Sequence, residues 1–212
     1  MKRRRKCSAF SQIEMVVILL VVGLLAGVSY SYIIKARRQA SKFTCTQNLK
    51  LICLFGKSYA ADHNGNFPWM LPPALGGSLE YSELGGHMFR YFQVQSNYIQ
   101  MLGLILCPQD TRQVATDWEY LANKNVSYFI GLDSRPNSPM CIVSGDRNIT
   151  SISDVTILAS QHALPSWIKS VGLHGDTGHI SFGDGHVEEL NSDKLTKAIQ
   201  DSGVVTNHFA VP

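Results

Sequence analysis

The chain of 212 residues is 45% hydrophobic and 17% charged, and its mean hydropathy is close to zero. This composition excludes an intrinsically disordered chain, and 17 glycines with 8 prolines are too few for a collagen-like or low-complexity protein. Only one long apolar run is present, which excludes a membrane protein with several spans. The length allows one ordinary domain with additional segments, or two small domains.

The basic residues are concentrated at the N-terminal end. Residues 1–50 carry ten lysines and arginines against one acidic residue, Glu14, whereas residues 51–212 carry nine against fifteen acidic residues. Five of the basic residues form a block, residues 2–6, that precedes the apolar run. A basic flank of this kind favours retention of the N-terminus in the cytoplasm. The basic residues do not form a mixed basic and aromatic surface, so we expect no nucleic acid as a partner.

Residues 13–34 form the apolar run, in which Glu14 is the only charged residue. About 20 helical residues cross a hydrocarbon core of about 30 Å, so the run can span a membrane once. Tyr30 and Tyr32 lie near its C-terminal end, where tyrosine rings favour the interface between membrane and water. Three interpretations compete: a cleaved secretory signal with a cut near residues 26–29, a plain signal anchor, or a prepilin leader. A carboxylate costs about 2.5–3.5 kcal/mol at the bilayer centre and less near its edge. A signal peptide has no use for such a carboxylate, so Glu14 discriminates among these interpretations.

Residues 6–14, Lys-Cys-Ser-Ala-Phe-Ser-Gln-Ile-Glu, followed by an aliphatic run, resemble the prepilin cleavage and N-methylation motif of type IV pilins and type II secretion pseudopilins. The resemblance implies cleavage between Ala9 and Phe10 by a prepilin peptidase and N-methylation of Phe10. It also implies that Glu14 neutralises the terminal amine of a neighbouring subunit in a helical filament. The sequence departs from the usual pattern at Ala9, where glycine is common, and at Gln12, where an aliphatic residue is common.

The helical pattern continues beyond the apolar run. Apolar residues recur at spacings of three and four with basic side chains between them, and no proline occurs before Pro68. Asn64-Gly65 provides a stop signal. One helix from residue 10 to residue 63 would be about 80 Å long; the alternative is two helices broken near residues 30–32. We therefore expect four segments: a basic leader, residues 1–9; a transmembrane and assembly helix, 10–34; an amphipathic stem helix, 35–64; and a globular head, 65–212.

The head is expected to contain a small antiparallel sheet. Residues 66–86 read as loop with a short helix, and residues 88–104 are ambiguous between helix and strand. Short β-rich runs follow at residues 126–130, 140–144, 156–159, 179–182 and 186–190. The last two flank Gly183-Asp184-Gly185, and Asp-Gly between such runs is a strong hairpin signal.

A closing helix is expected to be capped by Ser192 or Asp193, to run through Gln200 and to stop at Gly203. The predicted fold class is α+β, with a long N-terminal transmembrane and stem helix packed on the sheet of the head, as in pilins.

Several short blocks carry a second resemblance. They are residues 44–50, 59–68, 106–108 and 145–148, together with His174, which is followed by nine residues and Asp184-Gly185. The blocks resemble those of a large bacterial prepilin-like family with a C-terminal His-x9-Asp-Gly element, and they are spread over nearly the whole chain. This resemblance implies an architecture more than an activity.

One dense set of ligand-type side chains lies near the C-terminus: His174, Asp176, His179, Asp184, His186 and Glu188. One interpretation is a metal site, with Ca²⁺ held by Asp176, Asp184 and loop carbonyls. The other is a structural lock of the turn and hairpin, His174–Asp184–Gly185, in which His174 bonds to the backbone. We expect no enzyme, because the chain has no Gly-x-Ser-x-Gly elbow and no phosphate-binding glycine motif.

The cysteines limit the disulfides that can form. Cys7 would leave with the leader, and Cys45 and Cys53 lie eight residues apart, about 12 Å along a helix, too far to bond to each other. Each would have to reach Cys107 or Cys141, or the thiols remain free and buried. The family resemblance favours Cys45–Cys107, because both residues lie in the shared blocks.

These observations indicate a structural subunit of a type II secretion pseudopilus or type IV pilus-like filament. The expected location is the bacterial inner membrane, with the N-terminus in the cytoplasm and the head in the periplasm or outside the cell. The expected partners are related pilin or pseudopilin subunits, a prepilin peptidase and inner-membrane lipid. Two alternatives remain: a membrane-anchored binding domain for a metal or glycan that does not polymerise, and an anchored hydrolase.

Overall fold

The computed structural model describes residues 11–82, 87–150, 156–159, 165–169 and 173–212. The chain divides into two units, Met1–Ala40 and Ser41–Pro212, which we describe in turn. The expected cleavage position between Ala9 and Phe10 lies outside the described residues. The helix predicted as a stem contributes to both units, because the division falls inside it.

Helix α1 runs from Gln12 to Asp62 as one element of 51 residues. It has no break near residues 30–32, so a single helix is confirmed and the alternative of two helices is wrong. At its C-terminal end Asn64 adopts a left-handed conformation (φ 54°), and the Gly65 amide donates to the carbonyl of Ala60 at 2.8 Å. This six-residue bond is typical of a Schellman termination, which asparagine and glycine permit.

The first unit contains the apolar part of α1. Its aliphatic side chains are exposed, with Ile13, Leu24 and Val28 each more than 70% accessible. An 18-residue window of the helix has a mean hydropathy of 2.4, and none of that window is buried. The helix is therefore long and apolar enough to cross a membrane.

The second unit is built on a six-stranded sheet in the order β3-β6-β1-β2-β4-β5, and each neighbouring pair is antiparallel. The strands are β1 (Tyr128–Gly131), β2 (Ile142–Asp146), β3 (Thr156–Ala159), β4 (Thr177–Phe182), β5 (Val187–Asn191) and β6 (Asn207–Ala210). This antiparallel sheet and the long helix agree with the α+β class predicted from the sequence.

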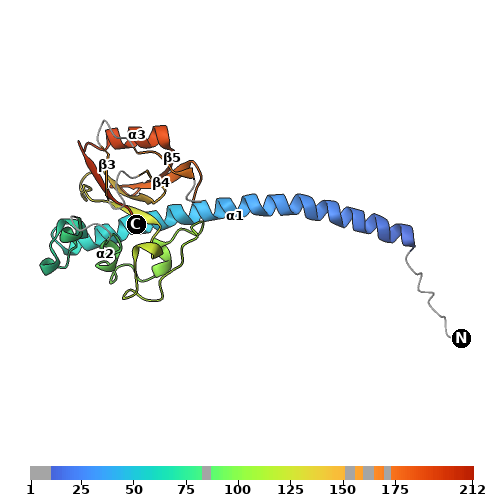
Figure 1. Cartoon of the computed structure of the whole chain (residues 1–212), viewed down its shortest axis with the longest axis horizontal. Coiled ribbons are helices and arrows are strands. Elements are labelled where there is room, and N and C mark those ends of the chain that lie inside the picture. The colour runs from blue at the N-terminus through green and yellow to red at the C-terminus, as the bar shows by residue number, and fades with distance from the viewer. Residues whose placement is uncertain (1–10, 83–86, 151–155, 160–164, 170–172) are drawn as a thin grey trace. The chain divides into compact units, whose positions relative to one another are not determined.

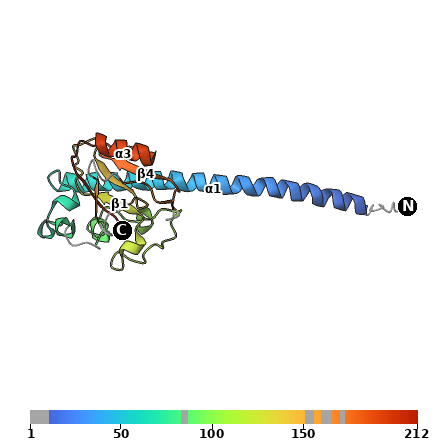
Figure 2. The ribbon, with the colours of Figure 1, turned by 45° about the horizontal axis from the view of Figure 1, so that its top comes forward.

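Two apolar cores lie on opposite faces of this sheet. Leu49 and Ile52 of α1 pack with Tyr128 and other side chains of the sheet in the first core. Helix α3 (Ser192–Asp201) covers the other face, where Leu195 packs with Phe182 in the second core. Figure 1 shows strands of the sheet between α3 and the C-terminal part of α1, and Figure 2 shows the same elements from another side.

Short helices fill the segments between α1 and β1. They are η1 (Pro68–Met70), η2 (Pro73–Leu75), η3 (Leu79–Ser82), α2 (Phe89–Gln93), η4 (Leu102–Ile105) and η5 (Asn123–Asn125). The segment that was ambiguous in sequence, residues 88–104, thus contains α2 and the start of η4, both helical.

The β4–β5 hairpin is confirmed. Its turn contains Gly183-Asp184-Gly185, where Gly185 has φ 100°, and the Phe182 amide donates to the carbonyl of His186 at 3.0 Å. Helix α3 follows, but its cap is Asn191, whose Oδ1 accepts from the Lys194 amide at 3.0 Å. The two expected caps, Ser192 and Asp193, already lie inside the helix, and the Ser192 hydroxyl accepts from the Trp167 amide instead.

Candidate functional site

Three buried polar side chains meet between the sheet and α1: Asp146 of β2, His179 of β4 and His174 of the preceding turn. Asp146 Oδ2 accepts from the His179 backbone amide at 2.7 Å and lies 3.0 Å from His179 Nδ1. The same oxygen lies 3.5 Å from His174 Nε2. The side chains of Asp146 and His174 are 0% exposed and that of His179 is 3% exposed. We call these three residues the buried triad.

Strand pairing places Asp146 and His179 side by side. Gly145 of β2 pairs with Ile180 of β4, so the next pair in this antiparallel register brings Asp146 opposite His179. Ile180 packs in the core under α3, and alternation along the strand therefore directs His179 to the α1 face. The turn before β4 delivers His174: Gly175 has φ 75°, and Thr177 Oγ1 donates to the carbonyl of His174 at 3.1 Å.

A disulfide borders the triad. Cys45 of α1 is bonded to Cys107, with their Cα atoms 5.4 Å apart, and Cys107 Sγ lies 3.4 Å from His174 Nε2. The structure therefore contains the pairing implied by the family resemblance. Cys53 and Cys141 are buried free thiols, and burial raises the pKa of Cys53 to about 11.

The surroundings of the triad are buried and polar. Tyr128 pairs with Asp146 across β1 and β2, and its hydroxyl accepts from Asn48 Nδ2 at 3.3 Å. Burial, and secondarily the charge of Asp146, raises the pKa of Tyr128 well above its usual value. Burial lowers the pKa of His174, and the nearby carboxylate of Asp146 only partly offsets this effect. His174 is therefore a predominantly neutral imidazole at neutral pH.

Beside the triad, Arg147 forms a two-pronged ion pair with Asp110. Its Nε and Nη2 donate to Oδ2 and Oδ1 of the carboxylate, both at 2.7 Å, and the Ser127 hydroxyl donates to Oδ2 at 2.7 Å. Burial alone would raise the pKa of Asp110, but the hydrogen bonds from Arg147 and Ser127 more than offset it, and the pKa is lowered. This pair fixes the end of β2 next to Asp146.

The metal site expected at Asp176 and Asp184 is not assembled in the described part of the chain. Asp176 is 70% exposed and forms a surface pair with Lys169 at 3.5 Å. Asp184 lies in the exposed hairpin turn, where its carboxylate accepts from the His186 amide at 2.9 Å. The Asp184 carboxylate thus stabilises the hairpin turn by a local hydrogen bond, as aspartate side chains in turns commonly do.

The expectation that His174 bonds to the backbone and locks the hairpin with Asp184 and Gly185 is wrong for the described residues. The His174 ring contacts Cys107 Sγ and the Asp146 carboxylate instead. Asp146 had been given no role in the sequence, although it lies in the block 145–148 that carries part of the resemblance. No local signal links it to His174, because the two are brought together by strand pairing.

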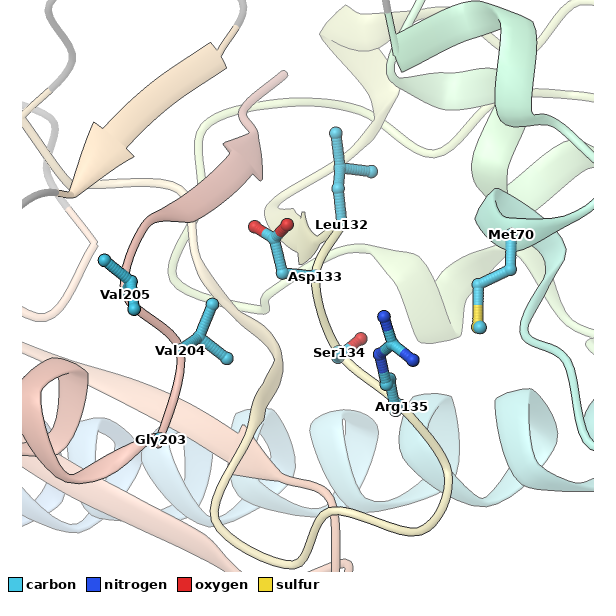
Figure 3. A pocket seen from close by; sticks show the side chains of 8 residues that line it. All are labelled: Met70, Leu132, Asp133, Ser134, Arg135, Gly203, Val204 and Val205. Atoms are coloured by element: carbon cyan, nitrogen blue, oxygen red, sulfur yellow. The ribbon is translucent and has the colours of Figure 1, made fainter.

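A second candidate is an open hollow on the surface, shown in Figure 3. It has a volume of about 400 Å³ and is lined by Met70, Leu132, Asp133, Ser134, Arg135, Gly203, Val204 and Val205. Asp133 already accepts from the amide and ring of His208. The described lining residues include no histidine or cysteine, so the hollow offers less reactive chemistry than the triad does.

The chain therefore has two features that call for a functional explanation: the exposed apolar segment of α1 and the buried triad. Its ligand-type side chains form two compact groups among the described residues, Cys45–Cys107–His174 and Asp146–His174–His179. In the first group the cysteines are bonded to each other. Comparison of the chain with protein-family models, with curated proteins and with solved structures gave no match in any of the three.

Proposed function

We propose that the chain is a structural subunit, similar to type IV prepilins and type II secretion pseudopilins. In this proposal a prepilin peptidase cuts between Ala9 and Phe10, and the apolar part of α1 then assembles with related subunits into a filament. The observation that carries the proposal is an exposed helix whose residues 13–34 hold one charged side chain, Glu14, at the end nearest the expected cut.

The exposed apolar surface supports an assembly role. Side chains all around the helix are accessible, including Leu19, Leu20, Val22 and Leu25 at 55–66%. Burial of apolar surface is favourable by about 25 cal/mol per Å², so such a segment needs lipid or other apolar helices around it. A membrane holds it before assembly, and neighbouring subunits hold it in a filament.

Glu14 has two conceivable roles. Its Oε2 accepts from the Ser11 backbone amide at 2.9 Å, and a carboxylate at a helix N-terminus stabilises the helix by about 0.3–1 kcal/mol. The proposal assigns it a larger role as partner of the terminal amine of Phe10 in a neighbouring subunit. Removing one member of an ion pair in an apolar environment costs about 3–5 kcal/mol. The two roles therefore predict assembly defects of different size.

The second unit fits a location outside the cytoplasm. The Cys45–Cys107 disulfide is typical of oxidising compartments, and the basic residues 2–6 favour a cytoplasmic N-terminus. We infer a single-pass inner-membrane protein whose second unit faces the periplasm or the cell exterior. Its partners are then related subunits, the peptidase and inner-membrane lipid.

Three substitutions in the full chain test the role of Glu14, in cells that supply the peptidase and the partner subunits. Glu14→Ala removes the carboxylate, and Glu14→Gln keeps an acceptor for the Ser11 amide but removes the charge. Gln12→Ala is the control, because it changes a polar side chain at the same end of the helix. The readouts are the amount of protein in the membrane fraction and the amount in sheared filaments.

We expect all three variants to insert like the wild type. Both Glu14 variants should lose incorporation by roughly two to four orders of magnitude, which corresponds to about 3–5 kcal/mol, whereas Gln12→Ala should assemble normally. Normal incorporation of Glu14→Gln would contradict the ion-pair role and leave only the local bond to Ser11. Equal defects in all three variants would contradict a specific role for the charge.

A further inference from the structure

We propose that the buried triad, Asp146, His174 and His179, is a binding site for one divalent transition-metal ion such as Zn²⁺. The site belongs to the second unit alone and does not depend on whether the chain assembles into filaments. Its ligands would be one carboxylate oxygen and two imidazole nitrogens, a set that zinc accepts.

The spacing of the three ligand atoms fits a metal ion. Bonds of about 2.0 Å to a tetrahedral zinc place neighbouring ligand atoms about 3.3 Å apart. Asp146 Oδ2 lies 3.0 Å from His179 Nδ1 and 3.5 Å from His174 Nε2, close to that value on both sides. The longer separation exceeds the usual 2.7–3.2 Å of an N–H···O hydrogen bond, so hydrogen bonding alone does not explain the approach of His174 to the carboxylate.

The charge of the site also favours a cation. The Asp146 side chain is 0% exposed, and a buried carboxylate requires a compensating partner. No described lysine or arginine forms an ion pair with it; the adjacent Arg147 is paired with Asp110 instead. A divalent ion between Asp146 and the two imidazoles would supply the missing positive charge.

An unpartnered carboxylate oxygen gives independent support. Asp146 Oδ1 is buried and has no hydrogen-bond partner among the described residues. Buried polar atoms are rarely left in this state. A metal at the triad gives Asp146 Oδ1 a role as a second carboxylate ligand, since carboxylates can bind with both oxygens.

The neighbouring disulfide sets which ligands can take part. Cys107 Sγ lies 3.4 Å from His174 Nε2, but it is bonded to Cys45 and cannot act as a thiolate. The oxidised chain therefore offers oxygen and nitrogen ligands only. Such a set favours zinc, copper or nickel over calcium, which prefers oxygen ligands throughout.

The test uses the full chain, purified in detergent with its disulfide intact, stripped with a chelator and dialysed against Zn²⁺ alone at micromolar concentration. The bound metal per chain is measured by elemental analysis, and the thermal unfolding midpoint is measured with and without Zn²⁺. Asp146→Asn and His179→Gln remove single triad ligands. The matched control is His186→Gln, because His186 lies on the same hairpin but is only half-buried and pairs with Asp184.

We expect the wild type and His186→Gln to hold about one zinc per chain and to unfold at a higher temperature with Zn²⁺. Both triad variants should lose the bound zinc and the shift, while the fluorescence of the buried Trp69 and Trp167 shows that their second unit remains folded. If the variants fail to fold, the wild type still decides the matter, because a wild-type chain that takes up no zinc overturns the proposal. Loss of zinc from His186→Gln, or its retention by both folded triad variants, also overturns it.

Discussion

Removing the Cys45–Cys107 disulfide should destabilise the second unit strongly. The bond joins residues 62 apart in sequence and fastens α1 to the segment after η4. A loop of this length restricts the unfolded chain by about 4 kcal/mol at 25 °C in the chain-entropy model. Since domains are commonly stable by only 5–15 kcal/mol, the double substitution Cys45→Ala and Cys107→Ala should remove a large share of the total.

Urea unfolding followed by tryptophan fluorescence measures this loss. Trp69 and Trp167 are 3% and 5% exposed and belong to the two cores on opposite faces of the sheet, so together they report on both. With a urea dependence of about 2 kcal/mol per molar, the midpoint should fall by about 2 M. Fluorescence is the better readout because the apolar segment of α1 can remain helical in detergent.

Cys53→Ala is the matched control, since Cys53 is a buried free thiol on the same helix. It should cost about 1 kcal/mol, a common value for loss of packing, and should leave the protein sensitive to reductant. The wild type treated with a dithiol reductant should unfold like the double variant. A loss below about 1 kcal/mol in the double variant, or no response of the wild type to reductant, would refute the reasoning.

Three further expectations concern the second unit, each measured by urea or thermal unfolding. Arg147→Met should cost about 3–5 kcal/mol, because it leaves the buried carboxylate of Asp110 without its partner; a loss under 1 kcal/mol would argue against a tight pair. The pKa of Asp110 is lower in the folded state than in the unfolded state, so ionised Asp110 stabilises the fold above the unfolded pKa of about 3.9, and this stabilisation is lost as the pH falls through the lower folded value. Asp110→Asn should remove this acid sensitivity of the unfolding free energy. An unchanged pH profile of stability in Asp110→Asn would contradict Asp110 as the source of the sensitivity. Gly131→Ala should lower the free energy of unfolding by at least about 1–3 kcal/mol, because the added Cβ would lie 2.0 Å from the carbonyl oxygen of Ile142. Gly103→Ala, whose added Cβ would have nothing within 4 Å, should be tolerated. Equal losses of stability in the two variants would show that the backbone at Gly131 shifts to relieve the contact.

Elements that depend on local signals were predictable from the sequence. Helix α1 follows from an uninterrupted run of helix-compatible residues that ends at Asn64-Gly65, and the β4–β5 hairpin follows from Asp184-Gly185. Strand β6 was missed. It has four residues and pairs with β1 and β3, which lie about 50–80 residues earlier in the chain. Nothing in its own short sequence indicates that β6 pairs with a strand on each side.

The buried triad was predictable only in part. His174 and His179 belong to the cluster of ligand-type residues read from the sequence, but Asp146 lies 28 residues before His174 and becomes its neighbour through the β2–β4 register. Conversely, Asp184 shares a sequence motif with His174 but lies in an exposed turn, because its carboxylate serves the backbone and ring of His186. Proximity in sequence was therefore a poor guide to which of these side chains meet in the fold.

The central claim is that Phe10 becomes the first residue of a subunit whose Glu14 pairs with a neighbour's terminal amine. The most direct measurement is mass spectrometry of the N-terminal peptide of the protein extracted from membranes of cells that contain a prepilin peptidase. We predict a chain that begins at Phe10 and carries a methyl group on its amine. A chain that retains Met1, or one that begins near Ala26, would contradict the claim.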